Sequence, residues 1–395
     1  MLSIPYIRFN KFDNEWFSKK LDLVSNVTMG QSPDSKNYTD NPNDYILVQG
    51  NADMQNGRIV PRVWTTQVTK LAEKGDLILS VRAPVGDVGK TDYNVVLGRG
   101  VAAIRGNDFL FYLLSRMKQT NYWAKFSTGS TFESINSSDI KSAEICLPSQ
   151  EEQTAIGSLF CTLDTLLSSY KDNLVNYQSF KATMLSKMFP KAGQTVPEIR
   201  LEGFKGEWEK SKLKDVAHRV QGNDGRMDLP TLTISASGGW MNQIDRFSAN
   251  IAGKEQKNYT LLKQGELSYN HGNSKLAKYG VVFELQEYEE ALVPKVYHSF
   301  RVNQLADAKF IEIMFSTKIP DRELGKLISS GARMDGLLNI SFDDFMNISI
   351  IIPTIKEQQA IGAYFSNLDK LISSYQEKIS QLETLKKKLL QDMFI

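Results

Sequence analysis

The most constraining feature of this chain is an internal duplication that carries one long helical pattern twice. Residues 151–189 align with residues 356–394 without a gap, so that Gln153 matches Gln358 and Asp164 matches Asp369. A repeat of this length predicts two copies of one structural unit. The 395 residues also exceed the size of one ordinary hydrophobic core, which predicts two or more domains.

Both copies have the apolar pattern of a coiled-coil helix. Their apolar residues recur in alternating steps of about four and three, a mean spacing of roughly 3.5 residues. We expect the seam to consist of Ile156, Phe160, Leu163, Leu167, Tyr170, Leu174 and Tyr177 in the first helix, and of Ile361, Phe365, Leu368, Ile372, Tyr375, Ile379 and Leu382 in the second.

Two lysines, Lys181 and Lys386, interrupt the seam at equivalent positions. A lysine at such a position can fix the register of a helix pair, or its side chain can extend into solvent near a frayed end. Both helices also begin with the Ser/Thr-x-x-Glu pattern of a capping box, at residues 149–152 and 354–357.

The segments before the two helices repeat more faintly. Pro5–Arg8 and Trp16 recur as Pro197–Arg200 and Trp208. Short β-type runs separated by Gly and Asn turns dominate both segments, and each contains one apolar helical stretch. We therefore expect an α+β fold of two globular domains with divergent central parts, each followed by a long helix. The expected division is 1–148 for the first domain, 149–190 for its helix, 191–353 for the second domain and 354–395 for its helix.

Composition excludes few functional classes. The net charge of +2 does not select nucleic acid as a partner, although 47 Lys and Arg residues leave room for local basic patches. No apolar stretch reaches the length of a membrane span, and no leader sequence is evident. The two cysteines, Cys146 and Cys161, form no metal-binding spacing, so we expect a protein of the reducing cytoplasm.

No catalytic motif is found in the sequence. There is no phosphate-binding loop and no dinucleotide fingerprint, and Asn41–Asp44 lacks the second proline of a DNA methyltransferase motif. The Pro-Asp pairs at residues 33–34 and 320–321 do not precede a nuclease-type strand. The histidines lie too far apart for a metal motif and are expected to be structural or surface residues: His218, His271 and His298. The sequence therefore predicts a protein without catalytic activity of its own.

The two helix starts carry a resemblance to a known family. A proline precedes the pattern Glu-Gln-x-x-Ile-x-x-x-Phe-x-x-Leu-Asp in both copies, from Pro148 to Asp164 and from Pro353 to Asp369. Residues 206–209 (Gly-Glu-Trp-Glu) and a Ser/Thr-Gly loop before each final strand accompany it. With two copies in this order, essentially the whole chain resembles the specificity subunit of type I restriction–modification enzymes.

This resemblance implies a fold and a set of partners. Each globular domain would be a target-recognition domain for one half of a bipartite, asymmetric DNA sequence. The two helices would pair as an antiparallel coiled coil with pseudo-twofold symmetry and dock two methyltransferase subunits, and restriction subunits would join that core. Double-stranded DNA would be the target, with no membrane involved. The chain itself would bind no cofactor, whereas its partners would use S-adenosylmethionine, ATP and magnesium.

Two other interpretations stay open at this level. The chain could be a coiled-coil adaptor that does not bind DNA, or the DNA-recognition part of a related type II methyltransferase or nuclease system. Salt-dependent affinity for duplex DNA separates the adaptor from a DNA-recognition subunit.

Candidate DNA contacts follow from residue type. Lys and Arg suit phosphate groups, whereas Arg, Gln and Asn suit base edges. In the first domain the candidates are Gln31, Ser32, Lys36, Asn37, Arg58, Arg62, Arg82, Lys90 and Arg99. In the second domain they are Gln243, Lys257, Tyr259, Asn270, His271, Lys275, Lys278 and Arg333.

Overall fold

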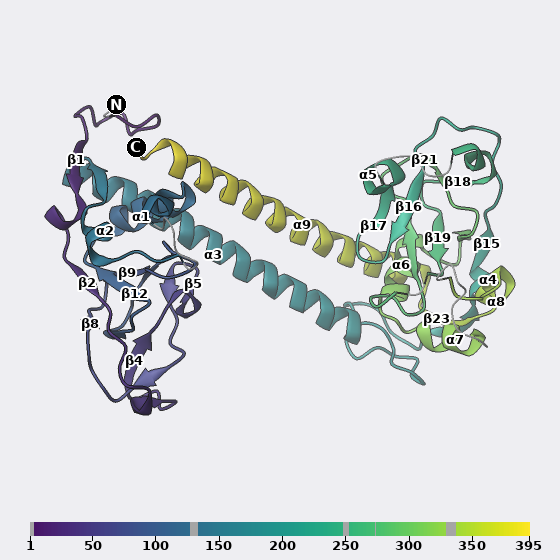
Figure 1. Cartoon of the computed structure of the whole chain (residues 1–395). Helices are drawn as coiled ribbons and strands as arrows, with labels where there is room; N and C mark the ends of the chain where they lie inside the picture. The colour runs from purple at the N-terminus through teal and green to yellow at the C-terminus, as the bar shows by residue number, and fades with distance from the viewer. Residues whose placement is uncertain (1–3, 127–132, 248–252, 273, 329–336) are drawn as a thin grey trace. The chain divides into compact units, whose positions relative to one another are not determined.

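The computed structural model describes residues 4–126, 133–247, 253–272, 274–328 and 337–395. The chain separates into two compact units (Figure 1). Unit 1 contains Met1–Asp172 together with Gln376–Ile395, and unit 2 contains Asn173–Tyr375. Because this division passes through both long helices, the four-part division expected from the sequence stays a prediction.

Unit 1 combines two mixed sheets with short helices. A six-stranded sheet has the order β2-β12-β9-β10-β6-β5, and a five-stranded sheet has the order β3-β7-β4-β11-β8. A third, two-stranded sheet pairs β1 with β13. The strands are β1 (Phe17–Lys20), β2 (Val27–Met29), β3 (Tyr38–Thr39), β4 (Tyr45–Val48), β5 (Met54–Gln55), β6 (Arg58–Ile59), β7 (Trp64–Thr65), β8 (Leu71–Ala72), β9 (Leu77–Ser80), β10 (Val88–Lys90), β11 (Val95–Leu97), β12 (Val101–Ile104) and β13 (Glu144–Leu147). The α-helices are α1 (Asp108–Gln119) and α2 (Ser137–Lys141), and the 3-10 turns are η1 (Leu21–Leu23), η2 (Ser35–Asn37), η3 (Asn51–Asp53) and η4 (Tyr122–Phe126).

Unit 2 has a smaller four-stranded sheet, in the order β15-β22-β19-β20, and three two-stranded sheets. One of these pairs β14 with β23, as β1 pairs with β13 in unit 1. The strands are β14 (Glu209–Lys212), β15 (Ala217–Arg219), β16 (Leu232–Ser235), β17 (Gly239–Asn242), β18 (Thr260–Lys263), β19 (Leu267–Asn270), β20 (Val281–Glu284), β21 (Glu290–Val293), β22 (His298–Val302) and β23 (Ser349–Ile352). The helices are α4 (Leu213–Val216), α5 (Gln243–Phe247), η5 (Gly253–Asn258), α6 (Ala308–Ser316), α7 (Asp321–Leu327) and α8 (Phe342–Met346). The expected mixture of helices and strands is confirmed in both units, and the one apolar helical stretch expected in each is α1 in unit 1 and α6 in unit 2.

The two long helices are α3 (Gln150–Lys187) and α9 (Ile355–Asp392), each of 38 residues. Their equal length follows from the gapless repeat and from the proline that precedes each helix. None of the helices within the described residues is both long and apolar enough to cross a membrane.

The same aromatic cluster forms the core of each unit. In unit 1, the Phe394 ring lies 5.1 Å from Phe109 and 5.8 Å from Phe160 between ring centroids, and Trp16 completes the cluster. The end of α9 therefore closes the core of unit 1.

In unit 2 the corresponding aromatic residues are Phe189, Trp208, Phe310 and Phe365. Phe189 lies 5.7 Å from Trp208 and 5.5 Å from Phe310, and Phe365 is fully buried in the same cluster. The end of α3 thus closes the core of unit 2 in the same way. The repeated Met-Phe at the end of each helix is explained by this role.

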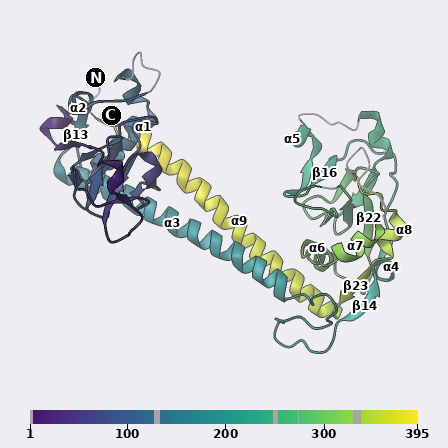
Figure 2. The same cartoon turned by 60° about the horizontal axis from the view of Figure 1, so that its bottom comes forward.

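Stretches of α3 and α9 lie side by side within each unit (Figures 1 and 2). In unit 1, Lys386 forms an ion pair with Asp164. In unit 2, Lys181 forms the equivalent ion pair with Asp369. Neither lysine extends alone into solvent, because each finds a carboxylate on the other helix.

The predicted capping boxes are only half right. The Ser149 hydroxyl accepts from the amide of Glu152 at 3.3 Å, as expected. The Glu152 carboxylate, however, is buried and binds the guanidinium of Arg8, and Glu357 binds Arg200 in the same way. A buried carboxylate needs a strong partner, and an arginine satisfies both of its oxygens.

Candidate nucleic-acid interface

Three turns of unit 1 meet where the chain passes from the five-stranded sheet to the six-stranded sheet. We call them the turn cluster (residues 30–32, 49–50 and 98–100); they follow β2 and β4 and connect β11 to β12. The Gln31 amide donates to the Leu97 carbonyl at 2.8 Å. The Arg99 amide donates to Ser32 Oγ at 3.1 Å. Hydrogen bonds therefore fix the first turn to the third.

Two glycines allow these turns to approach closely. A Cβ at Gly30 would overlap the carbonyl oxygen of Gly98, and a Cβ at Gly100 would overlap the carbonyl oxygen of Gln49. Only glycine fits where two backbones are in such contact. The sequence Gly98-Arg-Gly100 therefore serves backbone packing, and Arg99 lies at the tip of the turn.

Four polar side chains project from the turn cluster. Gln31, Gln49 and Arg99 are exposed and Ser32 is half-buried. The backbone amide of Gln49 donates to the buried Asp53 carboxylate at 2.7 Å, which holds the second turn in place, and its side-chain Nε2 donates to the Tyr38 hydroxyl at 2.9 Å. Three of the four were predicted from the sequence and are brought together here. Gln49 was missed, although a Gln-Gly-Asn run after an apolar strand is typical of a turn.

Arg82 adds a second exposed cation beside the turn cluster. It follows β9, and the amide of the preceding Val81 donates to the Gly100 carbonyl at 2.9 Å. Within the described part of unit 1, neither Arg82 nor Arg99 forms an ion pair with a carboxylate.

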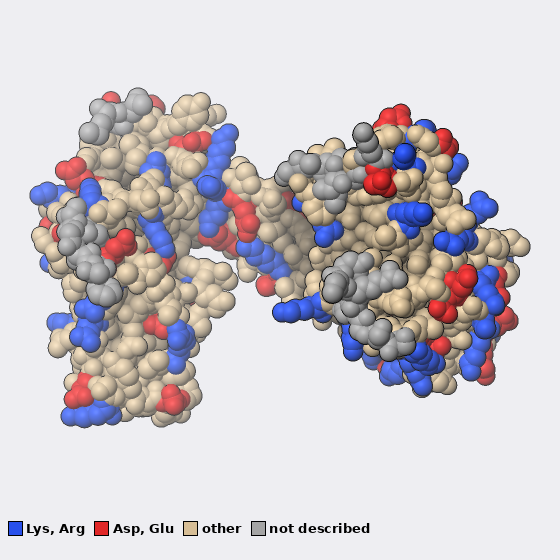
Figure 3. All heavy atoms as spheres, turned by 45° about the vertical axis from the view of Figure 1, so that its right-hand side comes forward, with Lys and Arg blue, Asp and Glu red and all other residues tan. Residues whose placement is uncertain are grey.

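The other predicted cations of the first domain each lie beside a carboxylate. The pairs are Lys36 with Asp34 (3.3 Å), Arg58 with Asp92 (2.9 Å), Arg62 with Asp53 (3.6 Å) and Lys90 with Asp108 (2.6 Å). The Asn37 amide is also used, because it donates to Gln67 Oε1 at 2.8 Å. In the view of Figure 3, basic and acidic side chains are interspersed over both units. Charge alone therefore does not single out one surface as a candidate for binding DNA.

In unit 2 the predicted lysines Lys257, Lys275 and Lys278 are exposed. Tyr259 is half-buried, and its hydroxyl accepts from Gln243 at 3.4 Å. The side chain of Asn270 is already engaged, since its Nδ2 donates to the Ile234 carbonyl and its Oδ1 accepts from the Gly272 amide. Among the described residues, Lys257 and Lys275 form no ion pair with a carboxylate, whereas the Lys278 ammonium lies 5.3 Å from the centroid of the Tyr279 ring.

Two predicted contacts of the second domain are contradicted by burial. Gln243 is 1% exposed and His271 is 5% exposed, so neither side chain can reach a DNA surface in this structure. The ring nitrogens of His271 lie 2.7 and 2.9 Å from the carbonyl oxygens of Leu338 and Val296. Arg333, also predicted, lies outside the described residues.

His271 stacks on a second histidine. Its ring centroid is 4.8 Å from that of His298 at an interplanar angle of 15°. Burial lowers the pKa of His298 to about 4, despite its hydrogen bond with the Ile340 carbonyl. Both histidines are therefore structural, as expected for the histidines of this chain, and His271 is not an exposed DNA contact.

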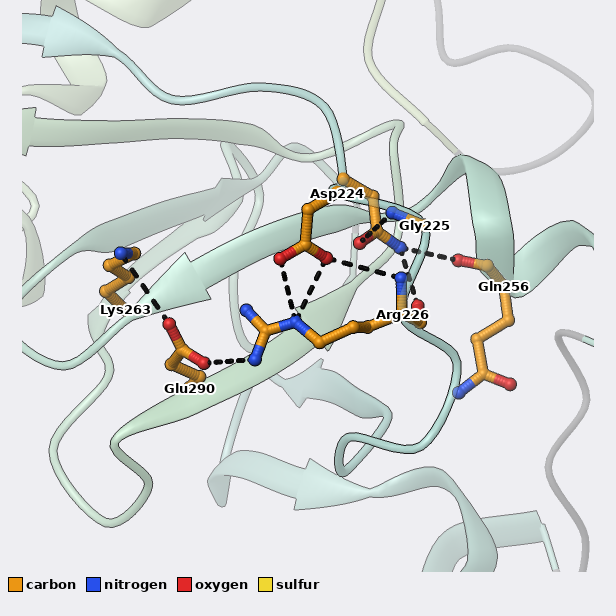
Figure 4. A network of polar contacts seen from close by, with 7 residues as sticks. Asp224, Gly225, Arg226, Gln256, Lys263 and Glu290 are labelled. Carbon is orange, nitrogen blue, oxygen red and sulfur yellow. Dashed lines mark hydrogen bonds and ion pairs between the residues drawn. The ribbon is translucent and has the colours of Figure 1, made fainter.

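A network of polar contacts fixes the segment before β16 (Figure 4). Arg226 lies between two carboxylates, with its Nε 2.8 Å from Asp224 and its Nη1 2.6 Å from Glu290. Lys263 contacts the same Glu290 at 3.6 Å. These basic side chains are neutralised within the domain and do not form an open anion site.

The family follows from a match over most of the chain. Residues 13–177 and 205–384 each match the family described as "Type I restriction modification DNA specificity domain". The chain belongs to this family. The two matches cover both globular segments with most of the helix that follows each.

Curated relatives from Methanocaldococcus jannaschii agree. A candidate specificity subunit of the type I restriction enzyme MjaX is 35% identical over 147 residues, covering 36% of this chain and 34% of the relative. The MjaVIII specificity subunit is 21% identical over 299 residues, covering 71% of this chain and 68% of the relative. The chain thus spans only about a third of the first relative.

Solved structures show the same fold. The type I restriction–modification S subunit from M. genitalium has a TM-score of 0.62 at 16% identity, covering 99% of both chains. A chain from a study of assembly and conformational transition in the type I system has a TM-score of 0.50 at 17% identity, covering 96% of this chain. The two-domain arrangement of this specificity-family member is shared with these structures.

The repeated Glu-Gln at each helix start has a physical role in this family member. Gln153 joins the start of α3 to the start of α1, because its Oε1 accepts from Asn107, the residue that caps α1. Gln358 accepts from the amide of Asp307, the residue that caps α6. The motif therefore fixes each long helix to its domain. The position of the motif could be predicted from the sequence, whereas its hydrogen-bond partners could not.

The predicted seam residues are all buried or half-buried. Ile156, Phe160 and Leu163 belong to the core of unit 1, and Ile361 and Phe365 to the core of unit 2. The first turns of each seam therefore pack into a globular core, and in unit 1 that core also contains Leu390 of α9.

Proposed function

We propose that this chain reads a bipartite, asymmetric DNA sequence in a type I restriction–modification complex, with one globular domain for each half-site. The observation that supports the proposal is that the two units share their core and helix-start contacts but expose different surfaces. The aromatic cluster and the helix-start contacts recur in both units, whereas their sheets and exposed polar side chains differ. A shared frame suits one set of partner subunits, and divergent surfaces suit two different half-sites.

We also propose that α3 and α9 pair as an antiparallel coiled coil. Asp164, early in α3, pairs with Lys386, late in α9, and Lys181, late in α3, pairs with Asp369, early in α9. This reciprocal order supports an antiparallel pair with pseudo-twofold symmetry. The helix length of about 57 Å, at 1.5 Å per residue, exceeds the roughly 34–36 Å of one DNA turn.

Exposed apolar side chains on the helices support docking of two methyltransferase subunits. Leu166 and Phe180 of α3 are 40% and 47% exposed, and their repeat equivalents in α9, Leu371 and Leu385, are 37% and 45% exposed. In each helix the two lie two heptads apart and so on one face. Leu166 and Leu385 belong to unit 1, and Phe180 and Leu371 to unit 2. Two equivalent apolar patches suit two copies of one partner.

The docking proposal is tested by removing one patch. We expect Leu166→Glu with Leu385→Glu to leave a complex with one methyltransferase subunit instead of two, as measured by native mass spectrometry. Val175→Glu is the matched control, because Val175 is 62% exposed on α3 but its equivalent in α9 is Ser380. A complex that keeps two subunits after the double substitution would contradict the proposal.

DNA recognition is tested by the salt dependence of binding. A subunit that neutralises several phosphates loses affinity steeply as salt rises, with a slope of roughly −0.9 per phosphate contact. Methylome sequencing of a host that expresses the chain with its methyltransferase subunit then gives the site. We propose that the partners supply the catalysis, with S-adenosylmethionine, ATP and magnesium. Affinity for duplex that is absent at low salt would favour the adaptor without DNA binding.

A further inference from the structure

We infer that the turn cluster is the base-reading element of the first domain, with Arg99 against a guanine and Gln49 and Gln31 against neighbouring base pairs. This inference rests on the proposed function. It assigns base readout to three exposed polar residues of unit 1: Gln31, Gln49 and Arg99. The other cations of that unit are not assigned to base readout.

The first argument is preorganisation. Base readout requires side chains held in a fixed position, since ordering a loose loop lowers affinity and specificity. The Arg99 turn is closed by a hydrogen bond from the Val101 amide to the Gly98 carbonyl at 3.2 Å, and its apex is bound to Ser32. The backbone contact at Gly100 holds Gln49 beside it. The three turns therefore form one rigid support.

The second argument is charge. Arg105, near the end of β12, is 59% exposed at its side chain but lies beside Glu73 and Asp76. Arg58 likewise lies beside Asp92. Arg99 is exposed without such a carboxylate among the described residues, so its guanidinium does not have to leave an internal partner to bind DNA. Its planar fork suits the O6 and N7 acceptors of guanine.

The third argument is the chemistry of the neighbours. Glutamine is a poor phosphate ligand compared with lysine or arginine, but it can both donate to and accept from a base edge. Gln31 and Gln49 lie on the turns that contact the Arg99 turn, and both are exposed. The Gln49 Nε2 donates one hydrogen to the Tyr38 hydroxyl at 2.9 Å, which orients this amide. An arginine flanked by uncharged amides on the contacting turns favours base readout, and Arg82, the exposed cation beside the cluster, is the candidate for a phosphate contact.

The test compares two substitutions at Arg99 in the full chain, co-expressed with its methyltransferase subunit. Arg99→Lys keeps the charge and removes the bidentate fork. We expect one guanine position of the first half-site to lose roughly ten- to a hundredfold of its discrimination in Arg99→Ala and in Arg99→Lys alike. The other half-site should stay fixed, which shows in the same methylome that the variants fold. Gln49→Ala should relax a neighbouring position.

Arg105→Ala is the matched control, as an exposed arginine of the same unit that lies beside carboxylates, and it should leave the motif unchanged. A phosphate contact at Arg99 would instead leave the motif intact in Arg99→Lys and lower the salt slope of binding by about one in Arg99→Ala. An unchanged motif in both variants would overturn the inference while leaving the proposed function standing. Absence of any motif in the wild-type complex would refute the proposed function itself.

Discussion

At the residue scale, the clearest device in this protein is a buried ion pair that occurs once in each unit. Arg8 binds Glu152 through two hydrogen bonds of 2.6 and 2.7 Å, and Arg200 binds Glu357 through two of 2.8 and 2.7 Å. Both glutamates are 1% exposed. Each pair connects the beginning of a domain to the first turn of its long helix.

Arg8→Met should lower the free energy of unfolding of unit 1 by about 3–5 kcal/mol, because it leaves the Glu152 carboxylate buried without a cation. Chemical denaturation followed by tryptophan fluorescence measures this. The double variant Arg8→Met with Glu152→Leu removes both charges and should recover most of the loss. A single variant within about 1 kcal/mol of wild type would show that water reaches the carboxylate.

The buried His298 makes unit 2 sensitive to acid. Its pKa of about 4 lies below the ordinary value near 6.5. Between these two pH values the histidine is protonated in the unfolded state but stays neutral in the folded state. Stability from this residue is complete above pH 6.5, falls as the pH drops towards 4, and amounts to up to about 3 kcal/mol. Unfolding curves of wild type and His298→Gln between pH 7 and 4 should converge as the pH falls. Parallel curves would contradict the assignment.

At the element scale, glycine lets each long helix approach its domain. A Cβ at Gly157 would lie 3.0 Å from Asp108 Cβ and from the Phe109 amide nitrogen, and one at Gly362 would lie 3.1 Å from Asp307 Oδ1. Two short helices thus dock against two long ones at the same place in the repeat.

Gly157→Ala should therefore have two opposing effects on the free energy of unfolding, a gain from helix propensity and a loss from overpacking. Propensity alone predicts a gain of about 1 kcal/mol, whereas overpacking costs about 1–3 kcal/mol. We expect a net loss of roughly 1 kcal/mol in thermal or chemical unfolding. Ser158→Ala, at the exposed neighbouring position, is the propensity control and should be neutral or slightly stabilising. A stabilised Gly157→Ala would refute the tight contact.

The lysines in the seam should be coupled to their aspartates. In a double-mutant cycle of Asp164→Lys and Lys386→Asp, we expect each single change to destabilise and the swapped pair to recover roughly 1 kcal/mol of coupling energy. Lys171 and Glu383, 2.6 Å apart but about half exposed, provide a matched pair that should couple more weakly. Equal coupling in both cycles would mean that partial burial adds nothing.

Elements differ in how well local sequence predicts them. The long helices follow from heptad spacing and helix-start chemistry, both of which are local. The pairing of β4 with β11, or of β2 with β12, is not local, so the turn cluster could not be assembled from sequence even though Gln31, Ser32 and Arg99 were each proposed. The burial of a side chain also depends on residues far away in the sequence, so local sequence does not predict it.

The same limit explains the errors in the second domain. Gln243 and His271 have the residue types of DNA contacts, but core packing encloses both. The carboxylate partners of Arg58 and Lys90 come from later segments of the chain, so their neutralisation could not be predicted either.

At the scale of the whole molecule, the proposed coiled coil would act as a ruler between half-sites. Removing one heptad within residues 163–184, with the matching heptad of α9, should change the separation of the domains by about 10 Å. The spacer should then change by about 3 bp at the 3.4 Å base-pair spacing, while the half-site sequences stay fixed. Methylome sequencing of the variant decides the matter. An unchanged spacer in an active complex would exclude the ruler.

The contribution of Met393 and Phe394 to the core of unit 1 also governs the order in which the protein can mature. The Ile7 amide donates to the Asp392 carbonyl at 2.9 Å, so the beginning of the chain waits for residues that are translated after the whole of unit 2. On the ribosome, unit 2 can close first because it is continuous in sequence. The first unit to be synthesised is thus the last to complete its fold. A nascent chain that lacks Met393 and Phe394 would expose the aromatic core of unit 1 to chaperones and proteases.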